Sequence, residues 1–189
     1  MRPARTALMP YGGEGLPNTL HLESLIRAIP DFPLPGILFR DITPLLKDAD
    51  GFKAAIDLFV DRFAKEDIEL VVGIEARGYM LGAPLAYHLG AGFVPVRKPG
   101  KLPGTKITEE YALEYGTNSL EIHEDAAVEG QRVLVVDDLL ATGGTAAATG
   151  RLMSRIGAEV VGYAFLIELE ALQGRRNLPP DKVTAFIKY

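Results

Sequence analysis

The 189-residue sequence contains neither cysteine nor tryptophan. Without cysteine the chain cannot form disulfides, bind zinc through sulfur or use a thiolate as a nucleophile. It also lacks any apolar run near the roughly 20 residues that a membrane-spanning helix needs. Residues 1–20 are too polar and too rich in glycine for a secretory signal. These features predict a cytoplasmic protein with no membrane association.

Positive charge is also scarce, because 25 acidic residues outnumber 20 lysines and arginines and give a net charge of -5 at pH 7. An acidic chain argues against general nucleic-acid binding, which needs a basic surface. An anionic ligand would therefore require a local cluster of cations. The length and the 48% hydrophobic content allow one domain with a sizeable core. We expect residues 18–189 to form that domain and residues 1–17, rich in proline and glycine, to form a flexible extension.

Residues 133–145 carry the strongest functional signal. The apolar run 133–136 predicts a strand buried on both faces of a parallel sheet, and Asp137 and Asp138 follow where such a strand ends. The chain then turns into a helix through Ala141, Thr142, Gly143, Gly144 and Thr145. Glycines allow a tight turn close to a ligand, and the amides at a helix N-terminus suit an anion. The pattern predicts a sugar phosphate site in which the acids hold ribose hydroxyls and the loop holds the phosphate.

An ordinary strand–loop–helix corner is the alternative interpretation of this stretch. Two adjacent acids directly after an apolar strand are costly without a partner or solvent, which favours a ligand site. The loop has no lysine after its glycines, as a P-loop would, and no G-x-G-x-x-G fingerprint of a dinucleotide site.

Short apolar runs alternate with helical patterns from residue 70 onward. The runs predict strands over residues 70–74, 93–96, 133–136, 159–167 and 183–187. Helices are expected over residues 50–66 and 79–89, and from the glycine loop to residue 156. This alternation predicts an α/β fold with a central, mostly parallel sheet flanked by helices.

Three further segments are expected outside that sheet. Helical spacing predicts a short helix that begins at Asn18 or Thr19 and includes Ile29. Prolines and a glycine in residues 32–46 predict an ordered loop without regular secondary structure. Loose alternation over residues 109–122 predicts an antiparallel flap.

Cations gather at the predicted carboxyl ends of two strands. Arg77 lies in a tight turn after one strand, where ligands bind in open α/β sheets. Arg97, Lys98, Lys101 and Lys106 follow another strand in a stretch rich in proline and glycine and without acids. Such a cationic loop suits a polyphosphate. A solvated basic loop is the alternative interpretation, and it is stronger for the two later lysines.

Four segments together resemble the adenine phosphoribosyltransferases, a branch of the type I phosphoribosyltransferase family. They are residues 32–46, 73–78, 97–104 with 113–116, and 133–145. The resemblance implies the type I phosphoribosyltransferase fold, with an N-terminal hood loop and an antiparallel flap. It also implies that the enzyme is a homodimer and converts adenine and phosphoribosyl pyrophosphate into AMP and pyrophosphate. Mg²⁺ is the implied cofactor, held mainly through substrate and water.

The resemblance also implies roles for individual residues. Asp137 and Asp138 would hold the ribose hydroxyls, and Ala141, Thr142, Gly143, Gly144 and Thr145 would bind the 5′-phosphate. Arg77, Arg97, Lys98 and Lys101 would bind the pyrophosphate. The resemblance implies a non-proline cis peptide at Glu75–Ala76. Glu114 on the flap, Asp137, Asp138 and Arg77 are the implied catalytic residues.

For the base, the resemblance implies that the backbone of Leu38 reads the 6-amino group and N1 of adenine. Phe39 and Leu169 would sandwich the ring, Arg40 would lie near it and Glu114 would contact N7. The 6-oxygen of a 6-oxo purine would face the carbonyl oxygen of Leu38, so that two acceptors oppose each other. This arrangement costs roughly 1–3 kcal/mol per unpaired group. The alternatives are a 6-oxopurine phosphoribosyltransferase and a non-catalytic sensor of phosphoribosyl pyrophosphate.

Overall fold

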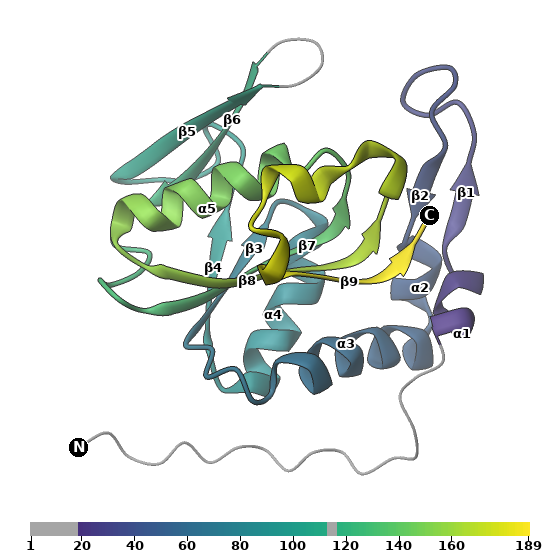
Figure 1. Cartoon of the computed structure of the whole chain (residues 1–189), viewed down its shortest axis with the longest axis horizontal. Helices are drawn as coiled ribbons and strands as arrows, with labels where there is room; N and C mark the ends of the chain where they lie inside the picture. The colour runs from purple at the N-terminus through teal and green to yellow at the C-terminus, as the bar shows by residue number, and fades with distance from the viewer. Residues whose placement is uncertain (1–18, 113–116) are drawn as a thin grey trace. The chain divides into compact units, whose positions relative to one another are not determined.

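The computed structural model describes residues 19–112 and 117–189 (Figure 1). The chain divides into two compact units, one within Tyr11–Arg62 and one that includes Phe63–Tyr189. The predicted extension over residues 1–17 lies outside the described residues. The prediction that residues 18–189 form a single domain stays a prediction.

The larger unit is built on a five-stranded sheet with the strand order β4-β3-β7-β8-β9. Every neighbouring pair is parallel, which confirms the predicted parallel sheet. The strands are β3 (Leu70–Ile74), β4 (Gly92–Val96), β7 (Arg132–Leu140), β8 (Glu159–Glu168) and β9 (Val183–Lys188). Helices α4 (Arg77–Leu89) and α5 (Gly144–Ile156) connect strands of the sheet (Figure 1), and three short 3₁₀ helices follow β8: η1 (Glu170–Leu172), η2 (Gly174–Asn177) and η3 (Pro180–Lys182).

The two faces of the sheet are covered by different helices. Alternate side chains of a strand point to opposite faces, and Val72 and Val135 belong to the same buried cluster as Leu152 of α5. On the other face, α4 packs so closely that a Cβ on its Gly82 would lie 3.4 Å from Cγ1 of Val71. The middle strands are therefore buried on both faces, as their unbroken apolar sequence predicts.

The strand order creates a topological switch point between β3 and β7. From β3 the chain crosses through α4 to β4, whereas from β7 it crosses through α5 to β8, on the opposite side. The loops that leave the carboxyl ends of β3 and β7 therefore diverge. Such a divergence opens the crevice in which open α/β sheets bind their ligands.

Strand β7 is longer than its apolar run. The predicted strand over residues 133–136 was too short, because Asp137 and Leu140 still pair with Phe165 and Glu168 of β8. Both acids of the motif lie within the strand rather than after it. The hydrogen-bonded partner strand, which the sequence pattern does not reveal, extends the ladder past the acids.

The predicted antiparallel flap is confirmed as the pair β5 (Lys106–Ala112) and β6 (Thr117–His123). Leu120 and Ile122 of β6 are buried in the same cluster as α5. On β5, Glu109 forms ion pairs with Arg151 and Arg155 of α5 at 2.6 and 3.1 Å. The hairpin is thus anchored to the helix that begins at the glycine loop.

The smaller unit contains α1 (Thr19–Ser24), β1 (Arg27–Ile29), β2 (Phe39–Asp41), α2 (Thr43–Lys47) and most of α3 (Ala49–Phe63). The prediction of one helix through Ile29 was wrong, because Arg27 and Ile29 pair with Asp41 and Phe39 in an antiparallel ladder. The prediction that residues 32–46 lack regular structure was also wrong, because β2 and most of α2 lie within this range. The Arg27 guanidinium donates to Asp41 Oδ2 at 2.6 Å, a tertiary contact that helical spacing cannot reveal.

None of the helices in the described parts of the chain combines the length and apolar character required to cross a membrane.

Candidate functional site

The acid pair of β7 and Arg77 at the start of α4 meet across the switch point. Arg77 Nε donates to Asp138 Oδ2 in an ion pair, in which the Asp138 side chain is only 5% exposed. The backbone N–H of Asp138 donates to Asp137 Oδ1 at 2.9 Å. Asp138 is therefore held by a cation from the neighbouring strand's loop, while Asp137 lines the open pocket beside it.

Asp137 is electrostatically the most unusual carboxyl group of this site. Burial raises its pKa well above the usual aspartate value, and the charge of Asp138 adds to the shift. Two neighbouring carboxylates in a poorly solvated place resist being ionised together. Ligand hydroxyls that donate hydrogen bonds to Asp137 would take the place of water at this carboxyl group.

Gly78 lets α4 approach this acid pair. A Cβ at Gly78 would lie 2.7 Å from the carbonyl oxygen of Val136 and 3.0 Å from Asp137 Oδ1. No other residue type lacks the Cβ that would clash here. Just before α4, the Glu75–Ala76 peptide is cis, which confirms the non-proline cis bond implied by the resemblance.

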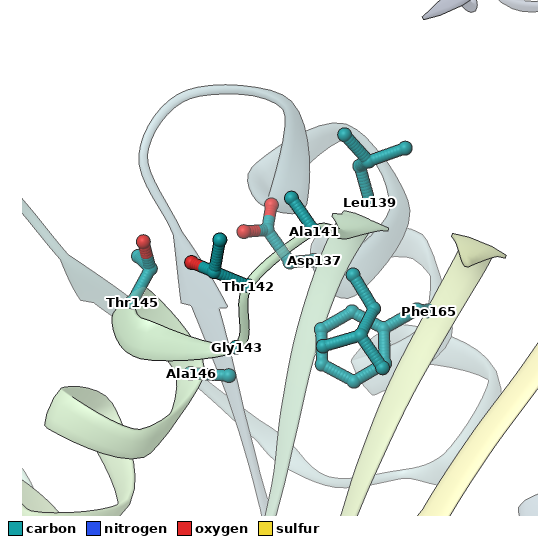
Figure 2. Close-up of a pocket in the computed structure, with 9 residues that line it drawn as sticks. Asp137, Leu139, Ala141, Thr142, Gly143, Thr145, Ala146 and Phe165 are labelled. Atoms are coloured by element: carbon teal, nitrogen blue, oxygen red, sulfur yellow. The ribbon is translucent and has the colours of Figure 1, made fainter. Parts of the chain in front are cut away.

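The glycine loop follows β7 as a tight turn into α5. Gly143 has a positive φ of 80° and lies directly before the first helical residue, Gly144. Figure 2 shows the carboxylate of Asp137 and the hydroxyl groups of Thr142 and Thr145 around the loop, with the Phe165 ring on the core side. These residues line a small pocket, together with Leu139, Leu140, Ala141, Gly143 and Ala146. Backbone amides at the start of a helix and two hydroxyls form a site suited to a phosphate.

Residues of η2 and of the flap, outside the motif, contact this loop. Gly174 of η2 packs against it, because a Cβ at Gly143 would lie 2.4 Å from the Gly174 carbonyl oxygen. Asn177 Nδ2 donates to the carbonyl oxygen of Thr142 at 2.7 Å. The flap also reaches the loop, since the hydroxyls of Thr145 and Tyr111 are 3.4 Å apart.

The predicted pyrophosphate loop after β4 is tied to the turn after β3. Glu75 Oε2 accepts hydrogen bonds from Arg97 Nε at 3.2 Å and from Lys98 N at 3.0 Å. Burial raises the pKa of Glu75, but these two bonds together with the charges of Arg97 and Lys101 outweigh it, and the net shift is downward. Arg97 is therefore engaged with a carboxylate of its own chain, whereas Lys98 and Lys101 contribute exposed side chains.

The predicted adenine-binding residues are divided between the two units. Leu38 is 47% exposed, next to β2, and Phe39 packs edge-on against Phe32 with ring centroids 5.1 Å apart. Arg40 lies in β2 opposite Ala28. In the larger unit, the backbone N–H of Leu169 donates to the Leu140 oxygen at 2.9 Å, which places Leu169 beside the glycine loop. Glu114 lies outside the described residues.

Comparison with known proteins identifies the family. The model of the phosphoribosyl transferase domain matches residues 44–188. An adenine phosphoribosyltransferase of Acaryochloris marina is 59% identical over 170 residues, which cover 90% of this chain and 100% of the relative. The chain belongs to the adenine phosphoribosyltransferases.

Solved structures support the same assignment. The adenine phosphoribosyltransferase of Thermoanaerobacter pseudethanolicus superposes with a TM-score of 0.89 at 51% identity, covering 91% of this chain and 100% of that one. The Saccharomyces cerevisiae enzyme, solved with adenine and an imino-altritol bisphosphate, has a TM-score of 0.82 at 40% identity over 89% of this chain and 96% of that one. The predicted type I phosphoribosyltransferase fold is thus confirmed.

Sequence reasoning brought Arg77, the two acids and the glycine loop together correctly, but it missed the residues that hold them. Gly174 and Asn177 are more than 30 positions from the loop that they contact, so no local pattern connects them. For Glu75 the resemblance implies only a cis peptide bond, whereas the structure shows that its carboxylate organises the loop after β4. For Gly174 and Asn177, the charged and polar residues between the apolar runs 159–167 and 183–187 are the signal that could have pointed to this segment.

Proposed function

We propose that this chain is a purine salvage enzyme that transfers the phosphoribosyl group of phosphoribosyl pyrophosphate to adenine, giving AMP and pyrophosphate. The observation that carries the proposal is the convergence of Arg77, Asp137, Asp138 and the glycine loop at the switch point between β3 and β7. A phosphate and a pyrophosphate in that crevice would meet hydrogen-bond donors and a cation, and the ribose hydroxyls between them would meet carboxylate acceptors.

In the reaction, the bond from the ribose anomeric carbon to the pyrophosphate oxygen breaks and a bond from that carbon to adenine N9 forms. The N9 proton is lost, and the electron pair of the broken bond leaves with the pyrophosphate. Positive charge builds on the sugar in the transition state, so nearby carboxylates stabilise it. The protein otherwise acts by positioning the two reactants.

Each part of the site has a role in this scheme. The amides and hydroxyls of the glycine loop bind the 5′-phosphate, and Asp137 and Asp138 accept hydrogen bonds from the ribose hydroxyls. Arg77 binds the departing pyrophosphate. Lys98 and Lys101 close over the pyrophosphate, and Arg97 supports their loop through Glu75.

Selection of adenine over 6-oxo purines is assigned to residues 38–40 and Leu169. A backbone N–H and C=O at Leu38 match N1 and the 6-amino group, whereas Phe39 and Leu169 supply apolar faces for the ring. A 6-oxo purine would leave polar groups unpaired there, at a cost of roughly 1–3 kcal/mol each. Glu114 on the flap is proposed to contact N7 of the base.

Mg²⁺ is proposed as the cofactor. Within residues 19–112 and 117–189, no three histidine or acidic side chains converge to form a metal site. Substrate oxygens and water would be the main ligands of the ion, a common arrangement for Mg²⁺ bound to phosphates. The bound ion would neutralise charge on the pyrophosphate.

A homodimer in the cytoplasm, without nucleic-acid or membrane partners, completes the proposal. The net charge of -5 supports the absence of nucleic-acid binding, and the absence of cysteine accords with a reducing compartment. Light scattering of the purified protein tests the dimer, since a single-chain mass of 20.5 kDa at all working concentrations would contradict it.

The function is tested by pyrophosphate release from phosphoribosyl pyrophosphate and Mg²⁺ with adenine, hypoxanthine, guanine or orotate offered separately. We expect turnover with adenine alone, abolished in Arg77→Ala and Asp138→Ala. Turnover with hypoxanthine or guanine would refute the assignment of residues 38–40. Tight binding of phosphoribosyl pyrophosphate without turnover of any base would favour a sensor.

A further inference from the structure

The segment that follows β8 contacts the carbonyl side of the glycine loop at three successive residues. A Cβ at Gly174 would lie 2.3 Å from the Ala141 oxygen, and Asn177 Nδ2 donates to the Thr142 oxygen at 2.7 Å. A Cβ at Gly143 would in turn lie 2.4 Å from the Gly174 oxygen. The glycine loop is therefore packed against η2 at these three residues.

The bond from Asn177 has a direct consequence for ligand binding. The carbonyl of Thr142 and the N–H of Gly143 belong to one planar trans peptide, so they point in opposite directions. A side chain that holds the carbonyl directs the N–H to the other side of the loop. The loop lines the pocket with Thr142 and Gly143, and an N–H turned toward the pocket is a donor for an anion.

Arg175, two residues before Asn177 in η2, forms an ion pair with a buried carboxylate that fixes the position of this helix. Glu168, at the end of β8, is 4% exposed and accepts hydrogen bonds from Arg175 Nε and Nη2, each at 2.8 Å. Arg175 Nη1 also donates to the Val183 oxygen of β9 at 2.9 Å. The pair raises the pKa of Arg175. A two-pronged contact of this kind restricts direction as well as distance, so it fixes η2 on the sheet.

We propose that Asn177 is a positioning residue for the 5′-phosphate, which orients the Thr142–Gly143 peptide so that the Gly143 N–H faces the phosphate, and that the Glu168–Arg175 pair holds Asn177 in place. The inference rests on the proposed function and refines one subsite of it. Without the Asn177 donor, this restraint on the orientation of the Thr142–Gly143 peptide is lost, and a rotated carbonyl would present an oxygen to the anion.

The test compares Asn177→Leu, which keeps the size of the side chain but removes the donor, with the parent protein. Loss of one oriented N–H to phosphate is expected to raise KM for phosphoribosyl pyrophosphate by about tenfold. KM for adenine and the melting temperature should stay nearly unchanged. Calorimetry should show an equal, about tenfold loss of affinity for AMP, which carries the 5′-phosphate, and no loss of affinity for pyrophosphate alone.

A second pair of variants separates positioning from general stability. Arg175→Lys keeps the charge but loses the two-pronged contact with Glu168, so it should reproduce the weaker binding of AMP. Lys188→Met is the matched control, because it breaks the Lys188–Glu170 ion pair of the same segment, which is also 2.8 Å long but more than half exposed. Lys188→Met should change neither the affinity for AMP nor the affinity for pyrophosphate.

Unchanged AMP binding in Asn177→Leu would overturn the inference. An equal loss of AMP and pyrophosphate binding, with a lower melting temperature, would also overturn it, because that outcome indicates a merely structural role. The AMP and pyrophosphate measurements require no turnover, so they test the inference separately from the proposed reaction.

Discussion

Replacing Gly78 by alanine tests how closely α4 must approach the acid pair. On an exposed helix this change stabilises, because alanine exceeds glycine in helix propensity by about 1 kcal/mol. Here the added Cβ would lie 2.7 Å from the Val136 oxygen and 3.0 Å from Asp137 Oδ1. Neither neighbour is the flexible end of a long side chain, so the helix start has to move.

The size of the effect follows from these distances. Carbon and oxygen atoms normally approach to about 3.3–3.6 Å, so the start of α4 must shift by roughly half an ångström or more. Overpacking of this kind costs about 1–3 kcal/mol, partly offset by the gain in helix propensity. We expect a net loss near 1 kcal/mol, or a melting temperature lower by roughly 3 °C for a chain of this size. Because Arg77 moves with the helix, kcat/KM should fall by about tenfold to a hundredfold.

Gly82→Ala, one turn further along α4, is the matched control. Its Cβ would lie 3.1 Å from Cε2 of Phe93, a ring that can shift, and it lies further from the acids. We expect stability close to that of the parent and normal kinetics. Both variants are compared by thermal melting and by AMP formation from adenine. Normal activity in Gly78→Ala, or an equal loss in Gly82→Ala, would refute the argument from close approach.

Three more substitutions probe the electrostatics of the site. Burial, together with the charge of Asp138, raises the pKa of Asp137, so the contribution of this group to the free energy of unfolding is present in acid and is lost as pH rises. Asp137→Asn should therefore be more stable than the parent at neutral pH and lose that advantage in acid. It should also transfer phosphoribosyl groups far more slowly. The Arg151 guanidinium lowers the pKa of Glu109, so Glu109→Gln should be less stable than the parent at neutral pH. The difference between the urea midpoints of the two proteins should vanish as the pH falls through the lowered pKa of Glu109. Glu75→Ala removes the acceptor of the Lys98 N–H and should raise KM for phosphoribosyl pyrophosphate several-fold but leave KM for adenine unchanged. If both KM values equal those of the parent, the loop after β4 is held in place without the Glu75 carboxylate.

Local patterns were sufficient for the sheet and for the turn of the glycine loop into α5. The five mainly apolar runs became five strands of one parallel sheet, because short runs of this kind that alternate with helical patterns are typical of parallel strands covered on both faces. Gly90 and Gly157 end α4 and α5 in left-handed conformations, as their positions after helical patterns predict. In these places the local preference and the tertiary environment agree.

Local patterns failed where a distant partner decided the outcome. Ile29 has helical spacing with the residues before it, yet it pairs with Phe39 in a short ladder. The strand β7 continues to Leu140 because β8 is there to receive its hydrogen bonds. The carboxylate of Glu75, 22 positions earlier, engages the guanidinium of Arg97, a contact that no local pattern indicates.

The sequence by itself determined the chemical groups of this protein: a strand with two acids, a glycine loop with hydroxyls, and cations after other strands. These features depend on residue type and on spacings of a few positions, so they can be predicted without the fold. Only the tertiary structure decided that Arg77 pairs with Asp138 across the switch point and that Asn177 holds the carbonyl of Thr142. Such contacts join residues 61 and 35 positions apart, and their distance in space is set by the packing of strands and helices rather than by any local preference.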